Sequence, residues 1–226
     1  MDIWPAIWLS VQLASLTMLL LLLIATPLAW WLTRTRTPLR SLIEALVALP
    51  LVLPPTVLGF YLLVLMSPDN VLGNVWLRLT GDTLAFSFAG LLIASVLYSL
   101  PFAVQPLQTA FQSVGAGVME AATTLGAGPW DVFRSIVMPL SRRGFLTAMV
   151  LSFAHTLGEF GVVLMVGGNI PGKTRVISIE VFNAVETLDY TTAHKLSAGL
   201  LVFSFLVLVF VYVINGKDRN KRRGAE

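Results

Sequence analysis

Cysteine is absent from this chain of 226 residues, and histidine is scarce, with only His155 and His194. The lack of thiols excludes disulfides, thiolate metal sites and cysteine nucleophiles, and two histidines are too few for us to expect a multi-histidine metal site. The sequence also has no Gly-x-x-x-x-Gly-Lys-Ser/Thr phosphate loop, so any ATP that drives this protein must be hydrolysed by another chain. We therefore predict that the chain is not itself an enzyme and has no cofactor of its own.

Charged residues make up only 12% of the chain, whereas hydrophobic residues make up 56%. This balance is outside the range of soluble domains and is typical of polytopic membrane proteins. Five stretches are long and apolar enough to cross a hydrocarbon core of about 30 Å. They are residues 7–32, 41–66, 84–104, 144–166 and 197–214. We expect an all-α integral membrane protein with five transmembrane helices in a single domain over residues 1–226.

The second predicted span contains four residues that weaken a helix, Pro50, Pro54, Pro55 and Gly59. Proline removes a backbone hydrogen bond, and a break at membrane depth is tolerated where neighbouring protein or a watery cavity covers the freed groups. The break is therefore either part of a pathway through the membrane or a kink that only packing requires. Pro101 is expected to interrupt the third span in the same way.

The segments around the spans carry further local signals. Ser41 and Glu44 have the spacing of a capping box at the start of the second span. Residues 67–82 predict a polar connection, and residues 167–196 are too polar to span the membrane. The latter segment is expected to hold a surface helix whose apolar face consists of Ile177, Val181, Val185 and Leu188.

The polar segment 106–143, between the third and fourth spans, has the pattern of two short helices set at an angle. The stretch 120–125 has an acid in its first turn and two alanines, and Gly126 can adopt the left-handed conformation that ends such a helix. Pro129 suits the first turn of a second helix, which Pro139 would close. That helix would present an apolar face made of Val132, Phe133, Ile136 and Val137.

This pattern resembles the EAA motif in the cytoplasmic loop of ABC importer permeases. The matching residues are Glu120, Ala121, Ala122, Gly126, Ile136 and Pro139, and Met138 stands where the family usually has leucine. In that family the loop is the coupling helix that sits in a cleft on the ATPase subunit. The resemblance therefore implies that the matching residues couple this chain to an ATPase. The residues alone would also fit an ordinary amphipathic hairpin at the membrane surface.

Three further segments, residues 49–55, 158–161 and 168–172, resemble the molybdate permeases of the ABC class. They read Leu-Pro-Leu-Val-Leu-Pro-Pro, Gly-Glu-Phe-Gly and Gly-Asn-Ile-Pro-Gly. The resemblance implies a permease subunit in the bacterial inner membrane that imports molybdate as a homodimer, in contact with lipid and not with nucleic acid. Its partners would be a cytoplasmic ATPase dimer, which binds ATP and Mg²⁺, and an extracytoplasmic oxyanion-binding protein. Permeases for tungstate or sulfate, or in another class an ion-coupled secondary transporter, are the alternatives.

The distribution of basic residues predicts the orientation in the membrane. If the first connection faces the cytoplasm, the inner side holds eleven basic residues and the outer side four. The inner set is Arg34, Arg36, Arg40, Arg134, Arg142, Arg143, Lys217, Arg219, Lys221, Arg222 and Arg223, and the outer set is Arg78, Lys173, Arg175 and Lys195. The positive-inside rule then places the N-terminus outside, the C-terminus inside and the segment 106–143 in the cytoplasm, where an ATPase would be.

Glu159, inside the fourth predicted span, is a functional candidate because a carboxylate at membrane depth is costly. Its neighbours Gly158 and Gly161 let another helix approach closely, so the alternative is a packing node in which Glu159 is hydrogen-bonded to protein. His155, where molybdate permeases would be expected to have an arginine, is one turn earlier on the same face and is an available partner. Because the cargo would be anionic, we expect Glu159 to bind protein and not substrate, with His155 or a backbone group of a neighbouring span as its partner.

Lys173 and Arg175 lie on the outer connection, where they could raise the local concentration of an approaching oxyanion. Ordinary solvated interfacial charge explains the same residues without such a role. The basic tail at residues 217–226 could likewise bind anionic lipid or only fix the topology.

Overall fold

The computed structural model describes residues 3–223, and the side chains of residues 3–213. Within that part of the chain the regular structure is entirely helical, as predicted. Three helices are each long and apolar enough to cross a membrane: α1 (Trp4–Arg34), α5 (Phe88–Gln112) and α12 (Tyr190–Arg223). Two bent pairs raise the number to five if each pair counts as one span. The pairs are α2 (Leu39–Val52) with α3 (Pro55–Met66), and the segment Pro129–Leu140 with α9 (Arg142–Gly158).

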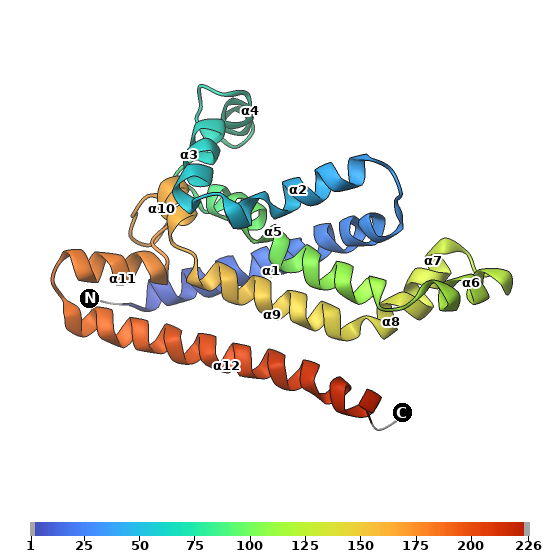
Figure 1. The fold of residues 1–226 in the computed structure, drawn as a ribbon. Helices are drawn as coiled ribbons and strands as arrows, with labels where there is room; N and C mark the ends of the chain where they lie inside the picture. Colours follow the sequence, from blue (N-terminus) through green and yellow to red (C-terminus); the bar gives the residue numbers. More distant parts are fainter. Residues whose placement is uncertain (1–2, 224–226) are drawn as a thin grey trace.

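Helices α1, α5 and α9 form the centre of the molecule and lie side by side (Figure 1). Their close approach depends on small residues, because a Cβ atom on Gly144 of α9 would collide with Ala110 of α5. Helix α12 packs against α9 and α11 and leaves most of its apolar surface exposed. In a membrane protein such a surface is covered by lipid or by another subunit.

Two groups of the shorter helices lie at opposite ends of this bundle (Figure 1). The N-terminus of α1 lies at one end, with α10 (Gly161–Gly167) and α11 (Ile177–Glu186). The other end holds the C-terminal ends of α1 and α12 and the helices of the predicted coupling loop. These are α6 (Ala116–Thr124), α7 (Pro129–Val132), the π-helical turn η1 (Phe133–Val137) and α8 (Met138–Leu140).

The second predicted span is broken where its prolines are. Helices α2 and α3 are bent by 112° at Leu53 and Pro54. The polar connection that follows contains a further helix, α4 (Val71–Thr80), which the sequence did not predict. It ends at Gly81 in the left-handed conformation, with φ of +79°.

The capping box predicted at the start of this span is wrong. Helix α2 begins before Ser41, at Leu39, and no side chain caps it. The Glu44 carboxylate instead accepts hydrogen bonds from Arg40 (3.0 Å) and from Gln108 of α5 (2.6 Å). Together an arginine and an amide donor outcompete the single backbone N–H that a capping box would offer.

Pro101 does not interrupt the third span, contrary to the prediction. Helix α5 continues through Pro101 and Pro106 to Gln112, so the polar segment placed at 106–143 begins only after Gln112. Helices α1 and α9 both pack against α5. Membrane helices tolerate proline where neighbours enclose the freed backbone groups, and packing here outweighs the lost bonds.

The fourth predicted span, residues 144–166, is not one helix. Helix α9 ends at Gly158, Glu159 is extended, and α10 begins at Gly161. Glycine has low helix propensity, and the Glu159 carbonyl accepts a hydrogen bond from the Ser178 hydroxyl of α11. The break therefore places Glu159 at a junction between three elements.

A helix is present in the predicted place at residues 177–186, but it buries a different face. Ile179 and Glu180 are buried, while Val185 and Leu188 of the predicted face are exposed. Glu180 points inwards because it forms an ion pair with Arg175 (3.4 Å). The last helix, α12, begins at Tyr190 and so starts before the predicted span 197–214.

Candidate functional site

The predicted coupling loop starts with α6, which carries the glutamate and the alanines of the EAA motif. Its end is a Schellman turn, in which the Ala127 N–H donates to the Ala122 carbonyl (3.1 Å) and the Gly126 N–H to the Thr123 carbonyl (3.0 Å). Gly126 has φ of +89°, the left-handed conformation that the sequence predicted. A Cβ atom there would meet nothing within 4 Å, so only the backbone conformation requires glycine.

The far side of α6 and its turn is open to contact. Glu120 and Ala121 are exposed, and Leu125 beside Gly126 is 88% exposed. Val118, two residues before Glu120, also exposes its apolar side chain. Charged, small and apolar groups are thus presented together at the tip of the loop.

The return leg of the loop, residues 129–140, comprises α7, η1 and α8 and begins at Pro129, as predicted. Its predicted apolar face points into the bundle: Val132, Phe133 and Val137 are buried and Ile136 is partly buried. The helical run that begins at Pro129 ends at Leu140, one residue after Pro139, which is close to the predicted end. Pro139 thus lies near the end of this continuous run.

Four aromatic rings join the return leg to the bundle. The Phe133 ring centroid lies 5.1 Å from that of Trp30 in α1 and 5.9 Å from that of Phe111 in α5. Phe111 in turn lies 5.8 Å from Phe145 of α9. Such aromatic pairs add about 0.5–1.5 kcal/mol each beyond their buried area. The sequence placed Phe133 on an apolar face but gave no signal for its partners, because periodicity does not link positions so far apart.

The two broken spans meet near their breaks, where α3 packs against α10. A Cβ atom added to Gly161 would lie 2.6 Å from the Cβ of Pro55, and one added to Gly59 would lie 2.7 Å from the Cβ of Met165. The structure therefore brings together candidates that the sequence predicted in separate spans. Gly158 takes no part in this contact, since a Cβ atom there would meet nothing within 4 Å.

Glu159 lies beside this contact and is only 5% exposed. Neither of its carboxylate oxygens has a hydrogen-bond partner among residues 3–213, so the predicted bond between Glu159 and protein is not formed there. The Ser95 hydroxyl of α5 lies nearby and also has no partner among these residues. The predicted partner, His155, is wrong: its Nδ1 lies 2.9 Å from the Ser99 hydroxyl, and its ring stacks on Phe102 with centroids 3.9 Å apart. Because α9 ends before Glu159, the two residues do not share a helix face.

If the chain is the transporter subunit that the resemblance implies, Glu159→Gln should keep most of the transport activity, because the carboxylate forms no ion pair with the described residues. Glu159→Ala should lower the yield of assembled complex, since it empties a buried position at a cost of about 0.5–3 kcal/mol. Uptake and the amount of purified complex are the two measurements. Loss of transport by the glutamine variant, in a complex that assembles and hydrolyses ATP normally, would mean that the charge itself is required.

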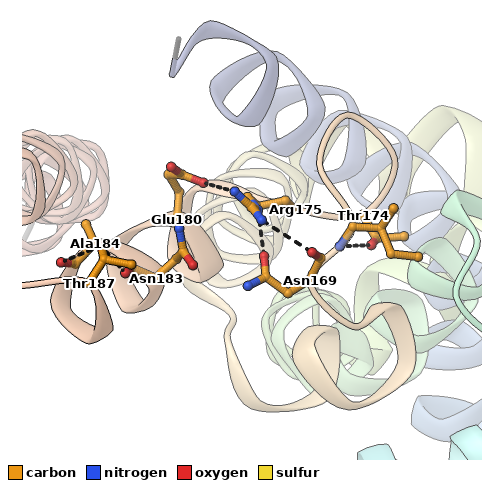
Figure 2. Close-up of polar contacts among 8 residues, drawn as sticks. Asn169, Thr174, Arg175, Glu180, Asn183, Ala184 and Thr187 are labelled. Atoms are coloured by element: carbon orange, nitrogen blue, oxygen red, sulfur yellow. Dashed lines mark hydrogen bonds and ion pairs between the residues drawn. The ribbon is translucent and has the colours of Figure 1, made fainter. Parts of the chain in front are cut away.

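The loop between α10 and α11 is held by a polar cluster (Figure 2). Arg175 Nε donates to Asn169 Oδ1 (2.6 Å), and Arg175 Nη1 lies 3.4 Å from Glu180 Oε2. The Thr174 hydroxyl donates to a backbone carbonyl at the end of α10 (2.6 Å). The charge of Arg175 is therefore paired with that of Glu180. Lys173, the other residue considered for attracting an oxyanion, is exposed.

Residues 6–219 match a known protein family, described as "Binding-protein-dependent transport system inner membrane component". The chain belongs to this family. The permease is thus a multi-pass component of the inner membrane and a subunit of a transport system that depends on a binding protein. The prediction that it is a transporter subunit and not itself an enzyme is confirmed.

Two relatives share the permease's sequence over most of their length. It is 59% identical over 207 residues to the molybdenum transport system permease protein ModB of Azotobacter vinelandii, covering 92% of both chains. It is 35% identical over 190 residues to the sulfate transport system permease protein CysT of Escherichia coli (strain K12), covering 84% of the permease and 68% of that protein.

Among solved structures, the permease is similar to a chain in the crystal structure of a bacterial alginate ABC transporter in complex with an alginate pentasaccharide-bound periplasmic protein. The TM-score is 0.73 at 17% sequence identity, over 93% of the permease and 77% of that chain. At this identity the likeness shows the fold alone. It confirms the predicted fold of an ABC importer permease.

Proposed function

We propose that this permease is the membrane-spanning subunit of an ATP-driven importer of molybdate. The observation that carries the proposal is the 59% identity to ModB of Azotobacter vinelandii across 92% of both chains. Identity to the sulfate permease CysT of Escherichia coli is only 35%, so molybdate is favoured over sulfate as the cargo.

In the proposed complex, two copies of the permease form one pathway on their two-fold axis, and an ATPase dimer binds beneath them. The docking surface is the exposed tip of the loop around Glu120, Ala121 and Leu125. ATP and Mg²⁺ bind to the ATPase, whose closure displaces α6. The return leg passes this displacement to α1, α5 and α9 through the rings around Phe133.

Outside the membrane, an oxyanion-binding protein delivers the anion to the end that carries Lys173. Selectivity lies mostly with that protein, because an importer must also release what it binds. The contact of Pro55 and Gly59 with α10 joins the two broken spans, and these breaks let the bundle alternate between outward-open and inward-open states. Glu159 supports this junction and does not bind the anion.

The orientation follows from charge: the N-terminus is outside and the coupling loop is cytoplasmic. The native chain has no cysteine, so single cysteines can be placed at exposed positions at either end of the bundle. A membrane-impermeant thiol reagent added to intact cells should label Glu186→Cys, at the end of α11, and should not label Gln112→Cys, at the end of α5. Labelling of Gln112→Cys from outside would reverse the orientation.

The function is tested by uptake of radiolabelled molybdate in a bacterium that lacks its own molybdate permease. The permease, its ATPase and its binding protein are expressed together, and an inactive ATPase variant is the control. The ion gradient is kept intact in both strains. We expect uptake only in the strain with the active ATPase. Uptake that continues with the inactive ATPase would indicate a secondary transporter, and uptake competed by sulfate better than by molybdate would indicate a sulfate permease.

A further inference from the structure

An apolar groove of about 600 Å³ lies between the last third of α1 and the return leg of the coupling loop. Leu22, Thr26 and Trp30 form its α1 side, and Trp130, Met138 and Phe145 lie opposite. It is open to the surroundings: Trp130 is 68% exposed and Leu23, also in its wall, is 72% exposed. Indole rings of this kind prefer the interface between hydrocarbon and water.

The groove and the arginine beyond it together extend over about one membrane leaflet. Leu22, Thr26, Trp30 and Arg34 follow one another at intervals of four residues and so lie along one face of α1. The twelve residue-to-residue steps from Leu22 to Arg34 span about 18 Å at 1.5 Å per step, about 12 Å of it along the groove from Leu22 to Trp30. Half of a hydrocarbon core of about 30 Å is about 15 Å. One acyl chain therefore fits along the groove from the bilayer centre to its surface.

A positive charge, Arg34, lies one helical turn beyond Trp30, the last groove residue of α1. The Arg34 guanidinium lies over the Trp30 ring, 4.5 Å from its centroid, which fixes the charge at the end of the apolar stripe. Arg134, on the return leg between the groove residues Trp130 and Met138, is also exposed. A guanidinium binds phosphate through several parallel hydrogen bonds, and cytoplasmic-leaflet lipids are partly anionic.

We propose that an anionic phospholipid of the inner leaflet occupies this groove, with an acyl chain between α1 and the return leg and its headgroup on Arg34. The proposal rests on the orientation given above, which places this end of α1 in the cytoplasmic leaflet. A lipid fits the groove better than the ATPase does, because the α1 wall lies within the membrane span. An ATPase outside the membrane does not reach that depth. The lipid contacts both α1 and the loop that binds the ATPase.

The first test uses tryptophan fluorescence of the complete permease–ATPase complex in vesicles. Bromine on an acyl chain quenches the fluorescence of a tryptophan that it touches. Vesicles with brominated phosphatidylglycerol and plain phosphatidylcholine are therefore compared with vesicles in which only the phosphatidylcholine is brominated. The brominated lipid has the same mole fraction in both. We expect stronger quenching by the brominated phosphatidylglycerol, and Trp130→Phe should reduce that difference to the part that comes from Trp30. Equal quenching in the two mixtures, or a difference that Trp130→Phe leaves unchanged, would mean that another chain or bulk lipid covers the groove.

The second test counts phosphatidylglycerol retained by the purified complex in native mass spectrometry. Arg34→Gln should reduce retention about fivefold, the effect expected for one interfacial arginine. Arg36→Gln, which removes an exposed arginine two residues beyond the stripe, is the matched control and should leave retention unchanged. Equal losses in both variants would refute a site at Arg34. Neither test requires molybdate transport, so a negative result here is distinct from failure of the proposed function.

Discussion

Replacing Gly126 by valine should abolish molybdate uptake and substrate-stimulated ATP hydrolysis while the permease still inserts in the membrane. Gly126 has φ of +89° in the turn that ends α6, and a β-branched residue in that conformation costs about 1–3 kcal/mol. The chain would relieve this strain by breaking the two hydrogen bonds of the Schellman turn. Helix α6 would then meet the ATPase at a different angle. Uptake, ATPase activity and the amount of permease in the membrane are measured together.

Gly126→Asn is the matched control for this variant. Asparagine is close to valine in size but adopts the left-handed conformation more readily. Uptake should therefore survive in Gly126→Asn and be lost in Gly126→Val. If both variants lose uptake equally, the cause is a clash with the ATPase and not strain in the turn. Normal uptake by the valine variant would show that coupling does not need this conformation.

The second large effect is expected at the contact between α3 and α10. Gly161→Ala adds a single Cβ atom, which would lie 2.6 Å from the Cβ of Pro55. Neither atom is at the end of a flexible side chain, so one backbone must move, and overpacking of this kind costs about 1–3 kcal/mol. We expect a lower yield of assembled complex and a lower melting temperature, with uptake reduced in proportion or more.

Gly158→Ala, three residues earlier in the chain, controls for loss of a glycine near the break. A Cβ atom at Gly158 meets nothing within 4 Å, so this variant should match the wild type in yield and melting temperature. Wild-type behaviour of Gly161→Ala would show that α3 and α10 do not need their close approach. Equal losses in the two variants would instead assign the effect to backbone flexibility at the break.

The features that the sequence predicted well are those decided by local backbone chemistry. The left-handed turn at Gly126 follows from an alanine-rich helix that stops at a glycine, and the break at Pro54 follows from missing N–H donors. The apolar face around Phe133 follows from its spacing. The family prediction succeeded because the residues of the EAA motif are spaced along one continuous stretch of chain.

The features that could not be predicted from the sequence depend on which residues, far apart along the chain, become neighbours in the fold. Glu44 accepts a hydrogen bond from Gln108 of another helix. Glu180 points inwards because it pairs with Arg175. His155 was assigned to Glu159 on the assumption of a continuous helix, which the break at Gly158 removes. Pro101 shows the converse error, since packing on both sides of α5 maintains a helix that local chemistry would weaken.

The ring cluster around Phe133 has a mechanical consequence. Close-packed interiors have low compressibility, so the return leg and the three helices that it touches have to move as one stiff body. A force applied at α6 is then not absorbed near its point of application. The flexible points are instead where main-chain hydrogen bonding is interrupted, at the breaks between α2 and α3 and between α9 and α10. Helices α3 and α10 lie away from the loop helices α6 to α8 (Figure 1).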